Sequence, residues 1–276
     1  MMARLERRGP DSQGCYIKGN AGLGHRRLAV IDLSDKAGQP MIDRQHGLSL
    51  VFNGTIYNYP ELREQLIAKG HEFTSSGDTE VILKAYTEWG VDCLQRLHGM
   101  FAFAIRDENN GSIMLARDRV GIKPLYFSYS SDRLLFASTT QSLLAADADI
   151  DTDIDAFALH NLFSLHAVVP APRTVLKGIR KLRPAHYMVF GDDGSVTEKR
   201  YWSLVAKRPD VTMDDNEWIA AIHDSLRRSV ERRLRIADVP VGVLLSGGID
   251  SSLLVALLSE AGVKDLKTFS VGFEDQ

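Results

Sequence analysis

Short apolar runs closed by turn-forming residues dominate the first half of the chain, and this pattern predicts β-strands. The expected strands cover residues 28–33, 48–53, 100–106, 112–117, 125–129 and 134–138. Two helices are expected between them, one from Pro60 to before Gly70 and one from Asp78, a residue type that favours the N-cap, to Gly90. Strands, then two helices, then more strands predict a layered α+β domain.

Beyond residue 155 the apolar pattern weakens. Residues 156–209 are rich in turn formers, and we interpret them as a connecting segment packed on the first domain. Thr212 and Asp215 resemble a capping box, and the apolar residues Trp218, Ile222, Leu226, Val230 and Leu234 recur every four positions, which predicts an amphipathic helix. Its arginines could bind phosphate or form a solvated helix face, and we favour the solvated face.

The last part of the chain predicts one strand–loop–helix–strand unit of a parallel sheet. Residues 239–245 are apolar throughout, as expected of a strand covered on both faces. A glycine-rich turn leads into a helix that ends at Gly262, and residues 268–273 predict a second strand. A single unit of this kind cannot cover its own sheet, so we expect this domain to be truncated.

Composition and charge exclude several function classes. With 33 basic and 36 acidic residues the net charge is −3, which does not support binding to nucleic acid. Two cysteines, Cys15 and Cys93, are too few for a disulfide framework or a zinc site. We expect no signal peptide, because no apolar run follows the charged residues at the start, and no apolar run approaches the roughly 20 residues that span a bilayer. We therefore expect a cytoplasmic protein without a membrane partner.

The turn Ser246-Gly-Gly-Ile-Asp-Ser251 is the first candidate for chemistry. Gly247 and Gly248 let backbone N–H groups approach an anion, and the following helix directs its positive end to the same place. Ser246 and Ser251 could donate to phosphate oxygens, and Asp250 could hold Mg²⁺. The simpler alternative is an ordinary turn with capping serines, but a strand before and a helix after favour a phosphate loop.

This turn resembles the pyrophosphate loop of the PP-loop ATP hydrolases, and residues 238–252 together resemble asparagine synthetases. The resemblance implies an α/β, adenine nucleotide α-hydrolase-like domain that binds ATP and Mg²⁺. It also implies that the backbone near Leu244 and Val271 lines the nucleotide pocket.

The N-terminal half resembles the glutaminase domain of the same family, which has the N-terminal nucleophile (Ntn) hydrolase fold. Six motifs occur in the family's order, within residues 8–11, 25–32, 53–58, 76–80, 99–104 and 116–126. The resemblance implies three domain segments: a type 2 glutamine amidotransferase domain (1–155) lacking its N-terminal strand, the connecting segment (156–209), and the start of a truncated ATP-binding domain (210–276).

The resemblance also implies roles for individual residues. Arg27 matches the arginine that binds the glutamine α-carboxylate, and Asp78 the carboxylate that pairs with the α-ammonium group. Asn53 and Gly54 match the oxyanion hole, and Leu28 and Val30 complete the glutamine-binding set. Taken singly, Arg27 could be a surface ion pair, Asp78 a helix cap and Asn53-Gly54 a turn. Their occurrence together, in order, favours the functional interpretation.

The chain departs from the family pattern at several positions. The family's nucleophile is an N-terminal cysteine, whereas this chain begins Met1-Met2, so no catalytic residue is identified and we expect the chain itself to be inactive as a glutaminase. We interpret Cys15, on a strand, and Cys93, on a helix, as buried structural thiols. Threonine replaces the usual glutamate at positions 55 and 139. With residues 166–172, these exchanges resemble the N-acetylglutaminylglutamine amidotransferase subgroup.

The resemblance implies that the parent enzyme hydrolyses glutamine to ammonia, adenylates a carboxylate with Mg-ATP and forms an amide. The acceptor would be aspartate or a glutamine-derived dipeptide, and a homodimer is left open. A β-lactam synthetase-like cyclase is the nearest alternative, since such relatives lack the nucleophilic cysteine. A non-catalytic glutamine-binding remnant is the alternative outside enzymes.

Overall fold

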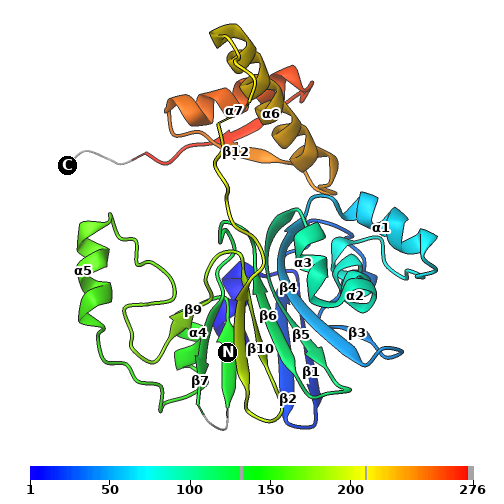
Figure 1. The fold of residues 1–276 in the computed structure, drawn as a ribbon, viewed down its shortest axis with the longest axis vertical. Helices are drawn as coiled ribbons and strands as arrows, with labels where there is room; N and C mark the ends of the chain where they lie inside the picture. The colour runs from blue at the N-terminus through cyan, green and yellow to red at the C-terminus, as the bar shows by residue number, and fades with distance from the viewer. Residues whose placement is uncertain (131–132, 209, 273–276) are drawn as a thin grey trace. The chain divides into compact units, whose positions relative to one another are not determined.

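The computed structural model describes residues 1–130, 133–208 and 210–272. The chain divides into two compact units, unit 1 (Met1–Leu204) and unit 2 (Val205–Gln276). Unit 1 is a layered α+β structure, and unit 2 contains a parallel strand pair with helices (Figure 1). Both fold classes agree with the sequence-based expectation.

A six-stranded sheet is the central layer of unit 1, with the order β11-β10-β6-β5-β4-β3 and antiparallel pairing throughout. Its strands are β3 (Met41–Asp43), β4 (Leu48–Ile56), β5 (Gly99–Asp107), β6 (Ile113–Arg117), β10 (His186–Phe190) and β11 (Val196–Arg200). The strands predicted at 48–53, 100–106 and 112–117 are confirmed as β4, β5 and β6.

Strict alternation along β5 gives this sheet two buried faces. Phe101, Phe103 and Ile105 point into one core, and Ala102 and Ala104 point into the other. Successive side chains of a strand point to opposite faces, so a run that is apolar at every position needs a cover on both sides. Unit 1 therefore has layers on both faces of the sheet.

Three helices cover the face on which the phenylalanines lie (Figure 1). They are α1 (Tyr59–Ala68), α2 (Asp78–Trp89) and the short α3 (Cys93–Arg96). The predicted helices are confirmed, with one change at the start of α2. Gly77 is its N-cap, and Asp78 is the first helical residue.

The other face packs against two smaller sheets. One is the hairpin of β1 (Ser12–Lys18) and β2 (Ala21–Arg27), and the second has the order β8-β7-β9. The strands of the latter are β7 (Tyr126–Tyr129), β8 (Leu134–Ala137) and β9 (Arg180–Lys181). Leu23 and Phe127 join this second core.

Residues 28–33, predicted as a strand, form a loop instead. The loop curls around the guanidinium group of Arg27, which donates hydrogen bonds to the carbonyl oxygens of Ile31, Asp32 and Ser34. Asp32 has a positive φ of 51°, which no strand can accommodate. The prediction was wrong because a buried charge, invisible in the apolar pattern, decides the backbone path.

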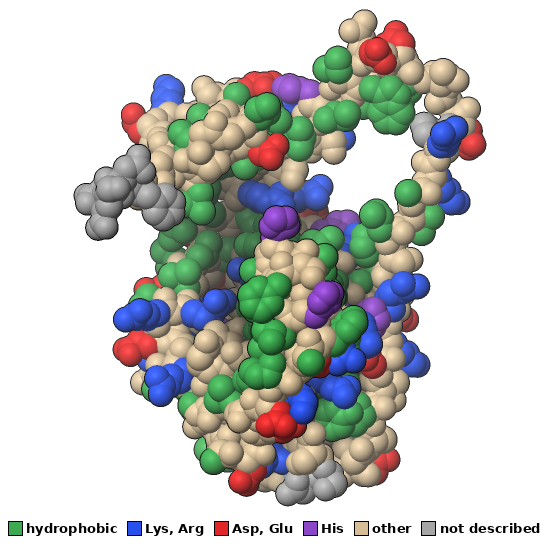
Figure 2. Space-filling model, turned by 90° about the vertical axis from the view of Figure 1, so that its left-hand side faces the viewer, with side chains coloured by type: hydrophobic (Ala, Val, Ile, Leu, Met, Phe, Trp, Pro, Cys, Tyr) green, Lys and Arg blue, Asp and Glu red, His purple; other side chains and the backbone are tan. Residues whose placement is uncertain are grey.

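Residues 156–204 do more than connect two domains. After α4 (Thr140–Leu144) come α5 (Ala156–Ser164) and the strands β9, β10 and β11, two of which extend the central sheet. All five residues of β11 are exposed, so the strand lacks the apolar signal from which strands are predicted. Figure 2 faces the side of unit 1 on which α5 lies and shows hydrophobic side chains at its surface. Within α5, Phe157 is 60% and Phe163 80% exposed.

Unit 2 begins with α6 (Asp215–Arg235), followed by β12 (Gly242–Leu244), α7 (Ile249–Glu260) and β13 (Lys267–Phe269). β12 and β13 are parallel, so the predicted strand–loop–helix–strand unit is present, although the predicted end of its last strand, Phe273, lies outside the described residues. The capping box of α6 is Asp214 with Glu217, not Thr212 with Asp215.

The arginines of α6 support the solvated-face interpretation. Arg227 pairs with Asp224 and Glu231, and Arg228 pairs with Asp224, all on the same helix. Within the part of the chain that the structure describes, no helix is both long and apolar enough to cross a membrane.

Asp118 is the polar centre of the loop between β6 and β7. Its side chain is fully buried and accepts hydrogen bonds from the backbone N–H groups of Phe101, Val120, Ile122 and Lys123 at 2.9 to 3.2 Å. A carboxylate can accept this many donors, whereas an apolar side chain would leave them unpaired in the interior.

We therefore expect Asp118→Ala to lower the free energy of unfolding by about 3 to 5 kcal/mol. Urea unfolding followed by tryptophan fluorescence in a Trp218→Phe background would measure it, since Trp89 and Trp202 both report on unit 1. The exposed Asp149→Ala is the control, with an expected change of about 0.5 kcal/mol or less. Equal losses in the two variants would contradict the role of Asp118.

Candidate functional site

A cavity of about 720 Å³ lies within unit 1 between β2, β4, β5, β8 and the start of α2. Its lining includes all six residues that the resemblance assigned to glutamine binding, namely Arg27, Leu28, Val30, Asn53, Gly54 and Asp78. These residues come from three separate stretches of the sequence, so the fold brings together what the motifs only suggested.

Arg27 ends β2 and is 8% exposed. Its guanidinium group donates to the carbonyl oxygens of Ser34 at 2.9 Å and Ile31 at 3.3 Å, and closely to that of Asp32. No ion pair of Arg27 occurs among the residues that the structure describes. The surface ion-pair alternative is therefore wrong, and the positive charge is held in place by neutral groups.

Asp78 is 5% exposed at the first position of α2. Burial raises the pKa of its carboxyl group from 3.8 to about 6, against the opposing effects of backbone N–H donors and the Arg27 charge. One of these donors is Ile56 N–H, 2.9 Å from Asp78 Oδ2. Near pH 7 the cavity thus contains a guanidinium group and a carboxylate contributed by different elements.

Asn53 and Gly54 lie within β4, so the turn alternative for this pair is wrong. The Asn53 side-chain amide reaches Ser138 Oγ at 3.5 Å, a weak contact. A Cβ atom at position 54 would lie 2.1 Å from the carbonyl oxygen of Met100. Only glycine fits there, because β4 and β5 approach each other too closely for any side chain.

The edge of β4 beyond β3 explains where the Gly54 N–H group points. Phe52 N–H donates to Gln39 Oε1 at 2.6 Å and Ile56 N–H donates to Asp78 Oδ2, both on the side away from β5. N–H groups two residues apart on a strand point in the same direction. The Gly54 N–H group therefore lies on this edge, facing the cavity that Gly54 lines.

The motifs did not identify His25 and Gln39 as site residues, although both line the cavity. His25 Nε2 lies 3.0 Å from the carbonyl oxygen of Phe52, and burial lowers the pKa of the imidazole to about 4, which keeps it neutral at pH 7. His25 opens the motif that contains Arg27, and its position there was the available signal.

Neither cysteine lines the cavity. Cys93 is a buried core residue, as expected, and burial raises the pKa of its thiol to about 12. Cys15 is exposed on β1, so its assignment as a buried thiol was wrong. Strand alternation explains this, since Gly14 and Tyr16 face inward while Cys15 and Ile17 face outward.

Thr139, at one of the exchanged positions, is the N-cap of α4, and its side chain accepts a hydrogen bond from the backbone N–H group of Ser142.

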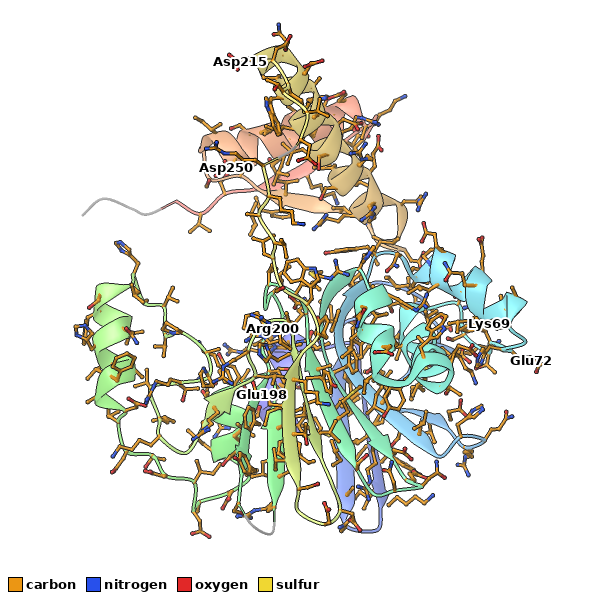
Figure 3. All side chains as sticks on the ribbon, viewed as in Figure 1. Lys69, Glu72, Glu198, Arg200, Asp215 and Asp250 are labelled. Carbon is orange, nitrogen blue, oxygen red and sulfur yellow. The ribbon has the colours of Figure 1, made fainter. Side chains whose placement is uncertain are left out.

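In unit 2 the segment Ser246–Ser251 covers the turn after β12 and the first three residues of α7. Gly247 has a φ of 81°, and Gly248 is the N-cap of α7. Ser251 Oγ lies 3.2 Å from Ser246 Oγ and donates to the carbonyl oxygen of Gly248 at 3.1 Å. Asp250 is exposed in the first turn of α7, where Figure 3 labels it.

The N-termini of the two helices of unit 2 differ. The capping box of α6 provides acceptors for the backbone N–H groups of Asp214 and Glu217, while the structure shows no side-chain cap on α7 among the described residues. An uncapped helix start behind a glycine turn is a suitable place for an anion.

Leu244 and Val271 are exposed on the same strand–helix–strand unit, and no cluster of three metal-binding side chains occurs in the described parts of the chain.

Comparisons with known proteins agree with this division. Residues 1–202 match the family described as glutamine amidotransferase domain, and residues 221–276 match the family described as asparagine synthase. Asparagine synthetase [glutamine-hydrolyzing] 1 of Bacillus subtilis is 40% identical over 276 residues, with all of this chain and 42% of that protein aligned. Asparagine synthetase [glutamine-hydrolyzing] 3 of the same organism is 36% identical, with 100% and 45% aligned.

The chain thus spans less than half the length of these two relatives. A solved glutamine phosphoribosylpyrophosphate amidotransferase from B. subtilis aligns with 92% of this chain and 52% of its own, at a TM-score of 0.48 and 20% identity. That likeness is too distant to add to the family match.

The raised pKa of Asp78 predicts a change of stability with pH. The folded chain holds the proton more tightly than the unfolded chain, so the stability due to protonated Asp78 is fully present below pH 4 and is lost as the pH rises through about 6. A shift from 3.8 to about 6 corresponds to about 3 kcal/mol.

Asp78→Asn stays uncharged at every pH. We therefore expect its free energy of unfolding, relative to that of the wild-type chain, to rise by about 3 kcal/mol between pH 4 and pH 7. Urea unfolding of both proteins across this range, in the Trp218→Phe background, would measure the difference. Parallel pH profiles would show that Asp78 titrates normally.

Proposed function

The chain belongs to the glutamine amidotransferase domain family, and on that premise we propose that the cavity of unit 1 binds glutamine for an ATP-driven, amide-forming ligase. The observation that supports this most directly is that Arg27 and Asp78 both line one cavity. A buried guanidinium group that forms no ion pair with a carboxylate of the described residues suits the α-carboxylate of an amino acid. A buried carboxylate with a pKa near 6 suits the α-ammonium group.

The side-chain amide of glutamine would then extend towards Asn53 and Gly54. Hydrolysis of an amide passes through a tetrahedral intermediate whose oxygen becomes negatively charged, and N–H donors placed there stabilise it. The Asn53 amide and the Gly54 N–H group supply two such donors on the edge of β4. The family's nucleophile is an N-terminal cysteine thiol, so we propose hydrolysis for an enzyme of the length of the curated relatives, of which this chain spans less than half.

For unit 2 we propose that the loop Ser246–Ser251 binds the phosphates of ATP. The open N-terminus of α7, the hydroxyl groups of Ser246 and Ser251 and the positive φ of Gly247 are compatible with that role. Mg²⁺ commonly takes only one or two protein carboxylates and completes its shell with phosphates and water. Asp250 fits as one such ligand, and Leu244 and Val271 would lie beside the adenine.

The whole protein would use this ATP to adenylate a carboxylate, because an unactivated carboxylate does not accept an amine at pH 7. Ammonia from glutamine would then displace AMP and form the amide. Aspartate is the acceptor that the names of the relatives suggest, and a glutamine-derived dipeptide is the alternative from the exchanges at Thr55 and Thr139. Cytoplasmic location and a homodimer remain part of this proposal.

The β-lactam synthetase-like alternative makes a different demand on unit 1. An enzyme that closes a ring with an internal amine needs no glutamine, so its first domain has no need of the Arg27 and Asp78 pair. A non-catalytic glutamine-binding remnant would bind glutamine but show no ATP chemistry. Glutamine binding and ATP–pyrophosphate exchange therefore separate the three functions.

We expect the chain to bind L-glutamine, and Arg27→Lys to weaken this binding at least about tenfold, because the three N–H groups of an ammonium cannot both replace the bonds of Arg27 to three carbonyl oxygens and donate to a ligand carboxylate. Isothermal titration calorimetry would measure both affinities. Arg183→Lys is the matched control, since Arg183 pairs with Glu198 at the surface away from the cavity. Absence of glutamine binding to the wild-type chain would refute the proposed function.

In the full-length protein, Asp250→Ala should abolish acceptor-dependent ATP–pyrophosphate exchange, because Asp250 is proposed to hold the metal beside the leaving pyrophosphate. Release of glutamate from glutamine should largely persist, since that reaction belongs to unit 1. Asp265→Ala, a change elsewhere in unit 2, serves as the control. Exchange at the wild-type rate in Asp250→Ala would rule out the assignment of this loop.

A further inference from the structure

The position of Arg27 depends on a loop rather than on a partner charge. Its three acceptors are carbonyl oxygens of residues 31, 32 and 34, so the guanidinium group moves with that loop. Asp78 directly follows the segment before α2, residues 74–77, so the path of that segment sets where its carboxylate lies. A ligand that engages both charges therefore requires the two segments to keep a fixed separation.

One carboxylate connects these two segments. Asp32 is 6% exposed, and its Oδ1 accepts from Ser34 N–H at 3.1 Å and from Ser34 Oγ at 2.5 Å. Its other oxygen, Oδ2, accepts from Ser76 N–H at 2.7 Å, two residues before Asp78. Burial alone would raise the pKa of Asp32, but the hydrogen bonds from Ser34 and Ser76 hold it at about 2, so the carboxylate stays ionised.

We propose that Asp32 is a positioning residue that sets the separation of Arg27 and Asp78 by holding one segment with each of its oxygens. The inference rests on the proposed function, since it assigns Asp32 a part in amino-acid recognition. Asp32 is absent from the cavity lining, so it acts through the residues it holds and does not touch the ligand. An asparagine has one acceptor oxygen and can hold only one of the two segments.

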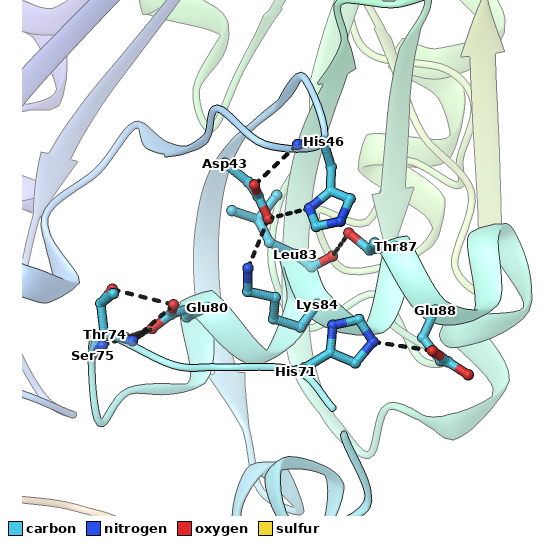
Figure 4. A network of polar contacts seen from close by, with 10 residues as sticks. All are labelled: Asp43, His46, His71, Thr74, Ser75, Glu80, Leu83, Lys84, Thr87 and Glu88. Atoms are coloured by element: carbon cyan, nitrogen blue, oxygen red, sulfur yellow. Dashed lines mark hydrogen bonds and ion pairs between the residues drawn. The ribbon is translucent and has the colours of Figure 1, made fainter. Parts of the chain in front are cut away.

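Glu80 provides a matched control in the same neighbourhood. It is also 6% exposed, and it accepts hydrogen bonds from the backbone and hydroxyl groups of Thr74 and Ser75, as Figure 4 shows. Glu80 therefore stabilises the segment before α2 as Asp32 does. Within the described parts of the chain, the hydrogen bonds of the Glu80 side chain reach Thr74 and Ser75 and not residues 28–34, so Glu80 does not connect the two segments.

The experiment compares three ligands on the full 276-residue chain by calorimetric or NMR titration. L-Glutamine engages both charges, glutaramic acid lacks the α-ammonium group, and 4-aminobutanamide lacks the α-carboxylate. We expect Asp32→Asn to weaken glutamine binding about tenfold or more. It should change the binding of glutaramic acid or of 4-aminobutanamide less than about threefold, because a changed separation of Arg27 and Asp78 matters only for a ligand that contacts both. Glu80→Gln should change all three affinities less than about threefold while also lowering the melting temperature.

The possible results separate the two proposals. If the wild-type chain does not bind glutamine, the proposed function fails and this inference fails with it. If the wild-type chain binds glutamine but Asp32→Asn behaves like Glu80→Gln, or weakens all three ligands equally, only the positioning role is overturned. If Asp32→Asn does not fold, Ser34→Ala replaces it, since it removes one bond to Oδ1. Unchanged glutamine binding in Ser34→Ala would then overturn the inference.

Discussion

The guanidinium group of a buried arginine needs acceptors for its N–H groups, and for Arg27, a residue that is 8% exposed, these are main-chain carbonyl oxygens of residues 31, 32 and 34. This choice of acceptor has two consequences. The backbone must curl so that three carbonyl groups converge, which requires the positive φ of Asp32. The charge also remains available to a ligand, because carbonyl groups hold a cation without neutralising it. The loop after β2 and the chemistry of the cavity therefore have the same cause.

The unpaired edge of β4 is the second constraint on the site. β3 covers only Leu48 to Leu50, so the N–H groups of Phe52, Gly54 and Ile56 need other acceptors or a ligand. The side chains of Gln39 and Asp78 accept hydrogen bonds from the N–H groups of Phe52 and Ile56, respectively. The third donor, the Gly54 N–H group, faces the cavity, at a point where the backbone approaches β5 so closely that only glycine fits. A sheet edge thus provides a donor of fixed direction at no cost in side-chain entropy.

Much of this architecture could be predicted from the sequence where the signal was local. The buried strands β4, β5 and β6 are apolar enough to be recognised, and α1 and α2 follow from Pro60 and their apolar spacing. The predictions failed where distant contacts decide the structure. Residues 28–33 are apolar but wrap Arg27, and β11 is fully exposed yet pairs with β10. The motifs predicted which side chains line the cavity, whereas the connection through Asp32 depends on contacts 44 residues apart.

Asp78 and Asp250 show how the same local motif places a carboxylate in two different electrostatic settings. Each lies in the first turn of a helix behind glycine, where the helix dipole favours a negative charge. α2 packs against the central sheet, so Asp78 is desolvated and its pKa rises to about 6, which prepares it to pair with a cation. Asp250 is exposed, beside an uncapped helix start that attracts anions. The metal–phosphate ligand proposed for that loop would bring both charges, the cation for the Asp250 carboxylate and the anion for the helix start.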